Sequence, residues 1–142
     1  MKKFFYELEY SYKDDNNLEH YFHIGYFSSP SKARKTKEEL KNKPGFATSG
    51  GNFKIVKHAA VFKENVTNKS GLCLYELSHE YETDEYDISI VFGLYSSLNE
   101  AHRKMEKEKK RKPYSETIDG FCIAKCIVDY QIGWSEGFSL KE

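Results

Sequence analysis

The sequence predicts an α+β fold: a tandem duplication of a ββαβ unit, with antiparallel sheets, one helix per unit and a core shared across a pseudo-twofold axis. The first observation behind this fold class is that residues 25–33, GYFSSPSKA, return 68 positions later as residues 93–101, GLYSSLNEA. The second is that both copies place an aromatic run before Ser-Ser and a charged run after it, which is typical of a strand followed by a capped helix. A repeat of this length that occurs only twice indicates two halves that pack on one another, rather than a solenoid.

Length and charge pattern bound the organisation of the chain. With 142 residues the chain suits one domain, so we expect a single domain over 1–142, built of repeats at about 1–64 and 71–142 that a short polar linker joins. The apolar runs are short and broken by charge, so no segment is expected to span a membrane. Because the start, MKKFF, lacks a small-residue cleavage site, we expect a cytoplasmic protein.

A hairpin is predicted at the start of the first repeat. From Tyr6 onward the run over residues 4–12 alternates between apolar or aromatic side chains and Glu or Ser, with Glu7 on the polar face, which is the period of a half-buried strand. Residues 13–17, KDDNN, have turn chemistry, because Asp and Asn hydrogen-bond their own backbone. The return strand is expected over 20–27.

A helix and a third strand complete this repeat. Ser29 followed by Pro30 predicts a capped helix, because proline fits the first helical position, where an N–H has no partner anyway. The helix is expected to end near Asn42, before the turn at Pro44-Gly45. The third strand is expected over 53–62.

The second repeat follows the same plan with stronger signals. Its strands are expected over 72–81, 86–95 and 121–130, and its helix begins at a capping box formed by Ser97 and Glu100. The stripe that docks this helix comprises Leu98, Ala101 and Met105. The core shared by the two repeats is expected to contain Tyr6, Leu8, Ile24, Ile55, Leu77, Ile90, Phe92, Phe121 and Ile123.

No motif in the sequence predicts catalysis or a bound cofactor. There is no phosphate-binding Gly-rich loop, HExxH or GxSxG. Cys73, Cys122 and Cys126 lack metal-ligand spacing and are expected to be buried, reduced thiols. His20 and His79 both lie near the first hairpin of their repeats and could form a pair for acid–base work on RNA, but exposed or strand-paired histidines are the commoner case. We therefore expect a protein that is not an enzyme and that holds no metal or cofactor.

Charge is balanced in total, with 22 basic and 22 acidic residues, but it is separated along the chain. The helices are basic and the hairpin turns are acidic, which would steer a charged partner if the two kinds of charge occupy separate sides of the molecule. The alternative is that each run is simply a solvated face. Trp134, in a tail without a counterpart in the first repeat, could anchor a partner or cap the core. The candidate partner-binding residues are Glu80, Glu82, Asp84, Glu85, Asp87, Trp134 and Glu136.

Both repeats also carry a family resemblance. The second repeat and the tail hold its best-matching motifs, Gly93-Leu94-Tyr95-Ser96-Ser97, Gly120-Phe121-Cys122-Ile123 and Trp134-Ser135-Glu136-Gly137-Phe138. The first repeat keeps Gly25, Ser28, Ser29 and Pro44-Gly45-Phe46 but lacks the tail motif. In these features the chain resembles, in two tandem copies, a small bacterial domain family of unknown function that is found around toxin and immunity loci. Most of the motifs are turn glycines and caps, so the resemblance supports the fold more than the function.

Two functional classes follow. The first, which the resemblance implies, is an immunity protein: a non-enzymatic inhibitor that neutralises a protein toxin, such as a nuclease, with its acidic hairpins in place of phosphates. The second is a nucleic-acid-binding protein in which the basic helices contact phosphates and the aromatic strands stack bases. Zero net charge weighs against the second class, because such domains usually carry a basic excess. A toxin gene directly upstream would favour the first.

Overall fold

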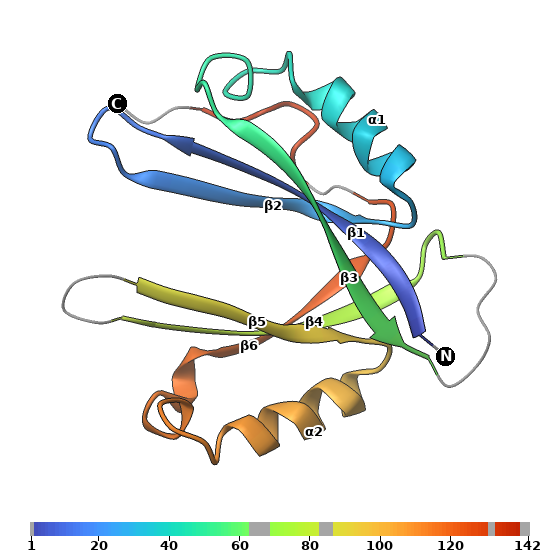
Figure 1. Cartoon of the computed structure of the whole chain (residues 1–142), viewed down its shortest axis with the longest axis vertical. Coiled ribbons are helices and arrows are strands. Elements are labelled where there is room, and N and C mark those ends of the chain that lie inside the picture. Colours follow the sequence, from blue (N-terminus) through green and yellow to red (C-terminus); the bar gives the residue numbers. More distant parts are fainter. Residues whose placement is uncertain (1, 63–68, 83–86, 131–132, 140–142) are drawn as a thin grey trace. The chain divides into compact units, whose positions relative to one another are not determined.

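The computed structural model describes residues 2–62, 69–82, 87–130 and 133–139 (Figure 1). It confirms an α+β fold with a duplicated layout, in which two antiparallel three-stranded sheets are each accompanied by one α-helix. The chain divides into two compact units. Unit 1 comprises Met1–Lys3, Ala59–Thr67 and Cys73–Cys126, and unit 2 comprises Phe4–His58, Asn68–Leu72 and Ile127–Glu142. A core common to both repeats stays a prediction.

The first sheet has the order β2-β1-β3, from the strands β1 (Lys2–Lys13), β2 (Glu19–Phe27) and β3 (Asn52–Val61). The predicted turn between β1 and β2 is confirmed. One oxygen of Asp14 accepts the backbone N–H groups of residues 16 and 18 at 2.9 and 3.0 Å, and Asn17 has a φ of 63°. These are the two properties for which Asn and Asp are favoured in turns.

Helix α1 (Pro30–Leu40) begins where the sequence predicts. Ser29 is its N-cap and accepts the backbone N–H of Lys32 at 3.2 Å. The side chains that α1 buries are Ala33, Thr36 and Leu40. Ala33 and Leu40 join the hydrophobic core of unit 2, whose other buried members are Leu8, Tyr10, Ile24, Phe27 and Phe46.

The C-terminal tail completes this core. The ring of Trp134 lies 4.8 Å from that of Phe22, and the ring of Phe138 lies 4.7 Å from Phe22 and 4.9 Å from Phe46. Just before the tail, the Asp129 carboxylate accepts both the backbone N–H and the hydroxyl of Ser28 at 2.8 Å. Trp134 therefore caps the core, which was one of its two predicted roles.

Unit 1, which contains most of the second repeat, has the same ββαβ order of elements. The second sheet has the order β5-β4-β6, and its strands are β4 (Cys73–Glu82), β5 (Asp87–Tyr95) and β6 (Phe121–Ile127). Helix α2 (Leu98–Glu108) follows β5, and two short 3-10 helices, η1 (Tyr114–Glu116) and η2 (Ile118–Gly120), lead into β6.

The two hairpins share one irregularity, which supports a duplication. The β1–β2 pairing shifts register between Leu8 and Glu9, and the β4–β5 pairing shifts between Leu77 and Ser78. These positions correspond in the two repeats. A bulge re-aims the side chains that follow it, so a single alternation of faces cannot hold on both sides of each shift.

Several expectations about burial are wrong. Ile90, predicted as core, is 40% exposed because β5 is an edge strand, and Leu98, predicted to dock α2, is 45% exposed at the first residue of its helix. Cys122, predicted to be buried, is exposed, whereas Cys73 and Cys126 are half-buried. Glu7, predicted on the polar face, is only 5% exposed, and the partners that hold it there are described below.

The N-terminal cap of α2 gives a direct test of local structure. Ser97 accepts the backbone N–H of Glu100 at 3.2 Å, so Ser97→Ala is expected to cost about 1 kcal/mol of unfolding free energy. The preceding Ser96 is the matched control, because it makes no hydrogen bond to another described residue. Urea unfolding checks this: equal midpoints for Ser97→Ala and Ser96→Ala would remove Ser97 from the cap.

Candidate functional site

An acidic concavity lies in unit 1, where the end of β4 and the start of β5 meet the two 3-10 helices. It encloses about 480 Å³ between β4, β5 and η2, and Glu80, Glu82 and Asp119 line it. An adjoining hollow of about 580 Å³ shares these three acids and adds Glu116 from η1. All four acidic side chains are exposed. Three separate elements therefore bring four carboxylates around one hollow surface.

The shape of the concavity depends on how closely η2 approaches β4. A Cβ atom placed on Gly120 would overlap the backbone oxygen of Glu80, so only glycine allows this approach. Behind the concavity, the buried His79 has its Nε2 2.7 Å from the backbone oxygen of Thr117, and a carbonyl can only accept, so Nε2 is the donor. The ring of His79 also lies 4.5 Å from that of Phe121. His79 thus serves as a structural anchor for the η1–η2 segment.

The acidic charge of the concavity is largely uncompensated. Within the part of the chain that the structure describes, Glu80, Glu82 and Asp119 form no ion pair, and Glu116 has only Lys112 at 3.6 Å, with both side chains exposed. Such an exposed pair contributes little. The concavity is therefore a surface of net negative charge, and the half-buried Phe121 is one of its lining residues.

The predicted site residues divide into three groups. Glu80 and Glu82 line the concavity as expected. Asp84 and Glu85 lie outside the described residues, as does the side chain of Asp87, whose backbone begins β5. The tail residues Trp134 and Glu136 belong to unit 2, where Trp134 is half-buried and Glu136 is exposed.

Sequence reasoning missed Glu116 and Asp119. Both lie in the loop that follows Pro113, and their side chains join the concavity only because two turns of 3-10 helix fold that loop back onto β4. The available signal was Gly120 directly before β6, since a glycine at the start of a strand often marks a close approach of two backbones.

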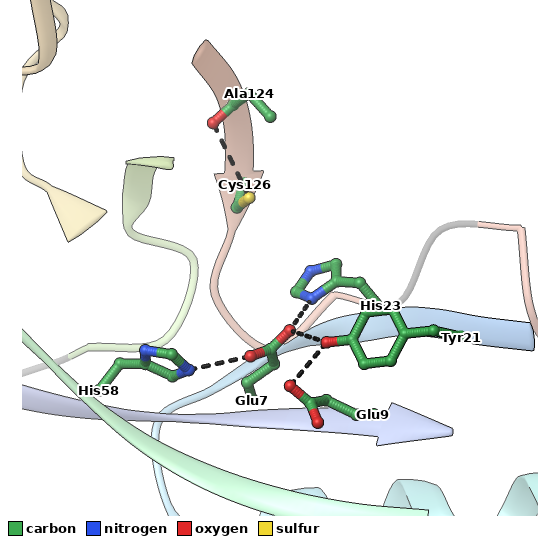
Figure 2. Close-up of polar contacts among 7 residues, drawn as sticks. All are labelled: Glu7, Glu9, Tyr21, His23, His58, Ala124 and Cys126. Carbon is green, nitrogen blue, oxygen red and sulfur yellow. Dashed lines mark hydrogen bonds and ion pairs between the residues drawn. The ribbon is translucent and has the colours of Figure 1, made fainter. Parts of the chain in front are cut away.

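Unit 2 holds a second polar cluster, which centres on the buried carboxylate of Glu7 (Figure 2). Its Oε2 lies 2.6 Å from Nδ1 of His23 on β2, and its Oε1 lies 2.9 Å from Nε2 of His58 on β3. The hydroxyl of Tyr21 lies 2.6 Å from Glu9 and 3.2 Å from Glu7, and its single proton is directed to the nearer carboxylate. An ionised carboxylate only accepts, so both facing histidine nitrogens must carry a proton. Figure 2 also shows the separate Cys126–Ala124 contact within β6.

Burial and hydrogen bonding act in opposite directions on this cluster. Burial by itself would raise the pKa of Glu7, but the hydrogen bonds from His23 and His58 outweigh it and hold that pKa at about 2, below its usual 4.5. Burial raises the pKa of Glu9, and the neighbouring charge of Glu7 adds to the increase. Burial likewise raises the pKa of Tyr21, together with its hydrogen bond to Glu9. Glu7 is thus the ionised carboxylate of the cluster, and its hydrogen bonds link β1 to β2 and β3.

A pairing of His20 with His79 stays a prediction. They belong to different units, and each has partners within its own. His20 lies 2.8 Å from Asp14 and its ring stacks on Tyr12 at 4.8 Å. His20, Asp14 and Tyr12 line a pocket of about 490 Å³ at the end of the first hairpin.

Over residues 2–62, 69–82, 87–130 and 133–139, no group of three or more His, Cys, Asp or Glu side chains is placed to hold a metal ion. Nor does this part of the chain contain a helix with the length and apolar character needed to cross a membrane. Comparison with protein-family models, with curated proteins and with solved structures found no match to this chain.

Proposed function

We propose that this protein is a non-enzymatic binding protein that neutralises a protein toxin by occupying a basic surface of that toxin with its acidic concavity. The observation that supports this is the set of four exposed carboxylates around one hollow, three of them without a counter-charge among the described residues. Exposed acids that pair with neighbouring lysines would be an ordinary solvated face. Acids that face a shared hollow without cations are instead suited to receive the cations of a partner.

A nuclease is the toxin class that fits this chemistry best. A nuclease must bind phosphates and therefore carries a cleft of Lys and Arg. An Arg or Lys that projects from the edge of such a cleft can enter the acidic concavity, where an Arg can form charge-assisted, bidentate hydrogen bonds with the carboxylates. The toxin itself is inferred from the family resemblance of the two repeats, and the acidic concavity supplies only the requirement for a basic partner.

Nucleic-acid binding is the weaker alternative. Several cations in the two helices or directly after them already face acids of this chain: Lys32 binds Asp129 at 3.1 Å, and Lys104 and Arg111 bind the buried Glu108 at 3.0 and 2.9 Å. The two hydrogen-bonding cations lower the pKa of Glu108 against the effect of its burial. Cations held in this way are less available to phosphates than a free basic stripe would be.

Charge reversal in the concavity tests the proposal. Glu80→Lys together with Glu82→Lys is expected to weaken binding to the product of an adjacent toxin gene by at least about 100-fold, because two attractive contacts become repulsive. The expected phenotype is loss of protection when the toxin and the variant are expressed together. Isothermal titration calorimetry at low and at physiological salt measures the affinity and its screening.

The control changes total charge by the same amount at exposed acids outside the concavity, Glu19→Lys with Glu39→Lys in unit 2. It should retain most of the affinity and the protection. Equal losses for the two double variants would mean that only overall potential matters, and undiminished binding by the concavity variant would place the interface elsewhere.

A further inference from the structure

The buried carboxylate of Glu7, with a histidine on either side, has no part in the acidic concavity (Figure 2). Its side chain is only 7% exposed, and its two oxygens lie 2.6 Å from His23 and 2.9 Å from His58. An ionised carboxylate is costly to bury unless a positive charge accompanies it. Among the described side chains that contact its oxygens, only the two histidines can carry such a charge. The candidates for the counter-charge are therefore the two imidazoles.

Three features of the cluster favour His23 over His58 as the charged partner. The contact of His23 with Glu7 is the shorter one, and charge-assisted hydrogen bonds are shorter than neutral ones. In the β1–β2 register His23 stands opposite Glu9, so a second carboxyl group lies beside it. The ring of Tyr26 lies 4.8 Å from that of His23 and 5.5 Å from that of His58, and an aromatic ring attracts a cation at this range.

The titratable groups that face His23 come from all three strands of the sheet. Strand β1 contributes Glu7 and Glu9, β2 contributes Tyr21 and Tyr26, and β3 contributes His58 and Lys54. Burial raises the pKa of Glu9, and the positive charge of Lys54 acts against that rise. Lys54 also disfavours a charge on His23. With both carboxyl groups ionised, however, the cluster holds two negative charges, and Lys54 and a protonated His23 together balance them.

The second repeat shows that the ββαβ fold does not require these histidines. Strand β4 keeps the acid, as Glu76. Val91 stands where β2 has His23, 68 positions earlier, and Cys126 stands where β3 has His58, at the same spacing. The two sheets nevertheless share one strand order and one bulge position. The fold alone therefore does not explain why unit 2 places two histidines on its buried carboxylate.

We propose that His23 keeps its proton at pH 7 and forms with Glu7 a pH-sensitive latch that holds the edge strand β2 on β1. Strand β2 pairs with β1 alone, so no second strand holds it in the sheet. The side chain of His23 is 34% exposed, which gives solvent access to its proton. Loss of that proton leaves the buried charge of Glu7 with neutral donors only. The attachment of β2 to β1 then weakens.

The direction of the pH response follows from the two states of His23. A histidine in an unfolded chain loses its proton near pH 6.5, and the latch delays that loss in the folded chain. The latch therefore stabilises unit 2 fully below about pH 6.5, and its contribution disappears as the pH rises through the folded-state midpoint of His23. The contribution of Glu7 is lost in the other direction, toward pH 2. The latch is closed between these limits.

An NMR titration of the wild-type chain tests the latch without any substitution. In ¹⁵N-labelled protein, the imidazole nitrogens of His23 are expected to titrate with a midpoint at least about one unit above the value of 6.5 for a free histidine. A midpoint at or below about 6.5 would overturn the proposal. So would a titration in which His58, and not His23, keeps its proton to the higher pH.

His23→Asn separates the charge from the hydrogen bond, because Asn offers an N–H near the position of Nδ1 but cannot become charged. A midpoint raised by one unit corresponds to a tenfold change in the unfolding equilibrium constant. Between pH 6 and pH 9, urea unfolding should therefore show that constant rising about tenfold more for the wild type than for His23→Asn. His20→Gln is the matched control. It removes the other carboxylate-paired histidine of β2 and should keep the wild-type response at His23.

Hydrogen exchange locates the effect in the structure. After correction for the intrinsic exchange rates, the protection of β2 amides is expected to fall between pH 6 and pH 9. The protection of β5 amides should not fall, since Val91 takes the place of His23 in that edge strand. An equal fall in both strands would overturn the proposal, as would a wild-type response in His23→Asn.

Discussion

A chain that ends at residue 130 is expected to lose at least about 3–5 kcal/mol of unfolding free energy, the range measured for removal of a large core aromatic. The physical reason is that unit 2 takes part of its core from the tail. Trp134 and Phe138 both contact Phe22, and the backbone N–H of Phe138 donates to the carbonyl of Pro44 at 2.9 Å. Without the tail, Phe22 and Phe46 would face water.

Far-UV circular dichroism during urea unfolding is the appropriate measurement, because the deletion removes the single Trp of the chain. The control ends the chain at residue 139 and so keeps every aromatic contact of the tail. The control is expected to unfold like the full chain. If the chain ending at 130 did the same, the tail would be an appendage and the core of unit 2 would be complete without it.

Replacement of Glu7 by Gln should have the next largest effect. The amide offers only one acceptor oxygen to the two histidine N–H groups that now face the carboxylate, and its NH₂ group would point at the other donor. A buried group left without a partner costs about 1–3 kcal/mol. We expect a loss of that size at pH 7 by urea unfolding. A loss no larger than that of an exposed Glu38→Gln would contradict the role of Glu7.

The pH dependence gives an independent signature. Because the folded-state pKa of Glu7 is lowered from 4.5 to about 2, its contribution to stability is fully present above pH 4.5. That contribution is lost as the pH falls toward 2, and it amounts to about 3 kcal/mol in total. Glu7→Gln should therefore show a shallower loss of stability between pH 5 and pH 2 than the wild type.

Glu9→Gln is the matched control for the pH dependence of stability between pH 5 and pH 2, and its expected effect has the opposite sign. Burial raises the folded-state pKa of Glu9, so this group favours the folded state at low pH and that contribution disappears as the pH rises through its folded-state pKa. Its removal should make the acid loss steeper. If the two variants lost stability in the same way between pH 5 and pH 2, the pKa of neither carboxyl would be shifted as the structure indicates.

Local signals in the sequence predicted the elements and their order. Ser29 with Pro30, and Ser97 before its charged run, identify both helix starts because a cap is a property of adjacent residues. Alternation predicted β1, and all six expected strands are present in the structure. The repeat of the Ser-Ser motif then fixed the ββαβ plan, and the structure confirms it even in the matching bulges at Leu8 and Leu77.

Long-range geometry explains what could not be predicted. Glu7 reads as a solvent-facing residue of an alternating strand, and only the pairing of β1 with both β2 and β3 brings His23 and His58 to it. Because His23 and His58 are distant from Glu7 in sequence, no local sequence pattern indicates that they contact it. Ile90 was assigned to the core by its alternation alone, and alternation does not distinguish an edge strand from a central one.

The concavity was predicted in part for a related reason. Glu80 and Glu82 precede a predicted turn and were therefore expected at its exposed end. Glu116 and Asp119 come from a loop whose course depends on the fit of Gly120 against β4 and on the hydrogen bond from His79 to Thr117. Such a fit between distant segments is visible only in three dimensions.

The central claim, that the acidic concavity receives the cations of a partner, is tested most directly by NMR with a short basic probe. Tetra-arginine titrated into ¹⁵N-labelled protein at low salt is expected to shift the amide resonances of Glu80, Glu82, Glu116 and Asp119 first, and physiological salt should weaken the effect. The Glu80→Lys, Glu82→Lys variant should lose these shifts. Shifts that are spread evenly over exposed acids such as Glu19 and Glu39, or that survive the charge reversal, would contradict the claim.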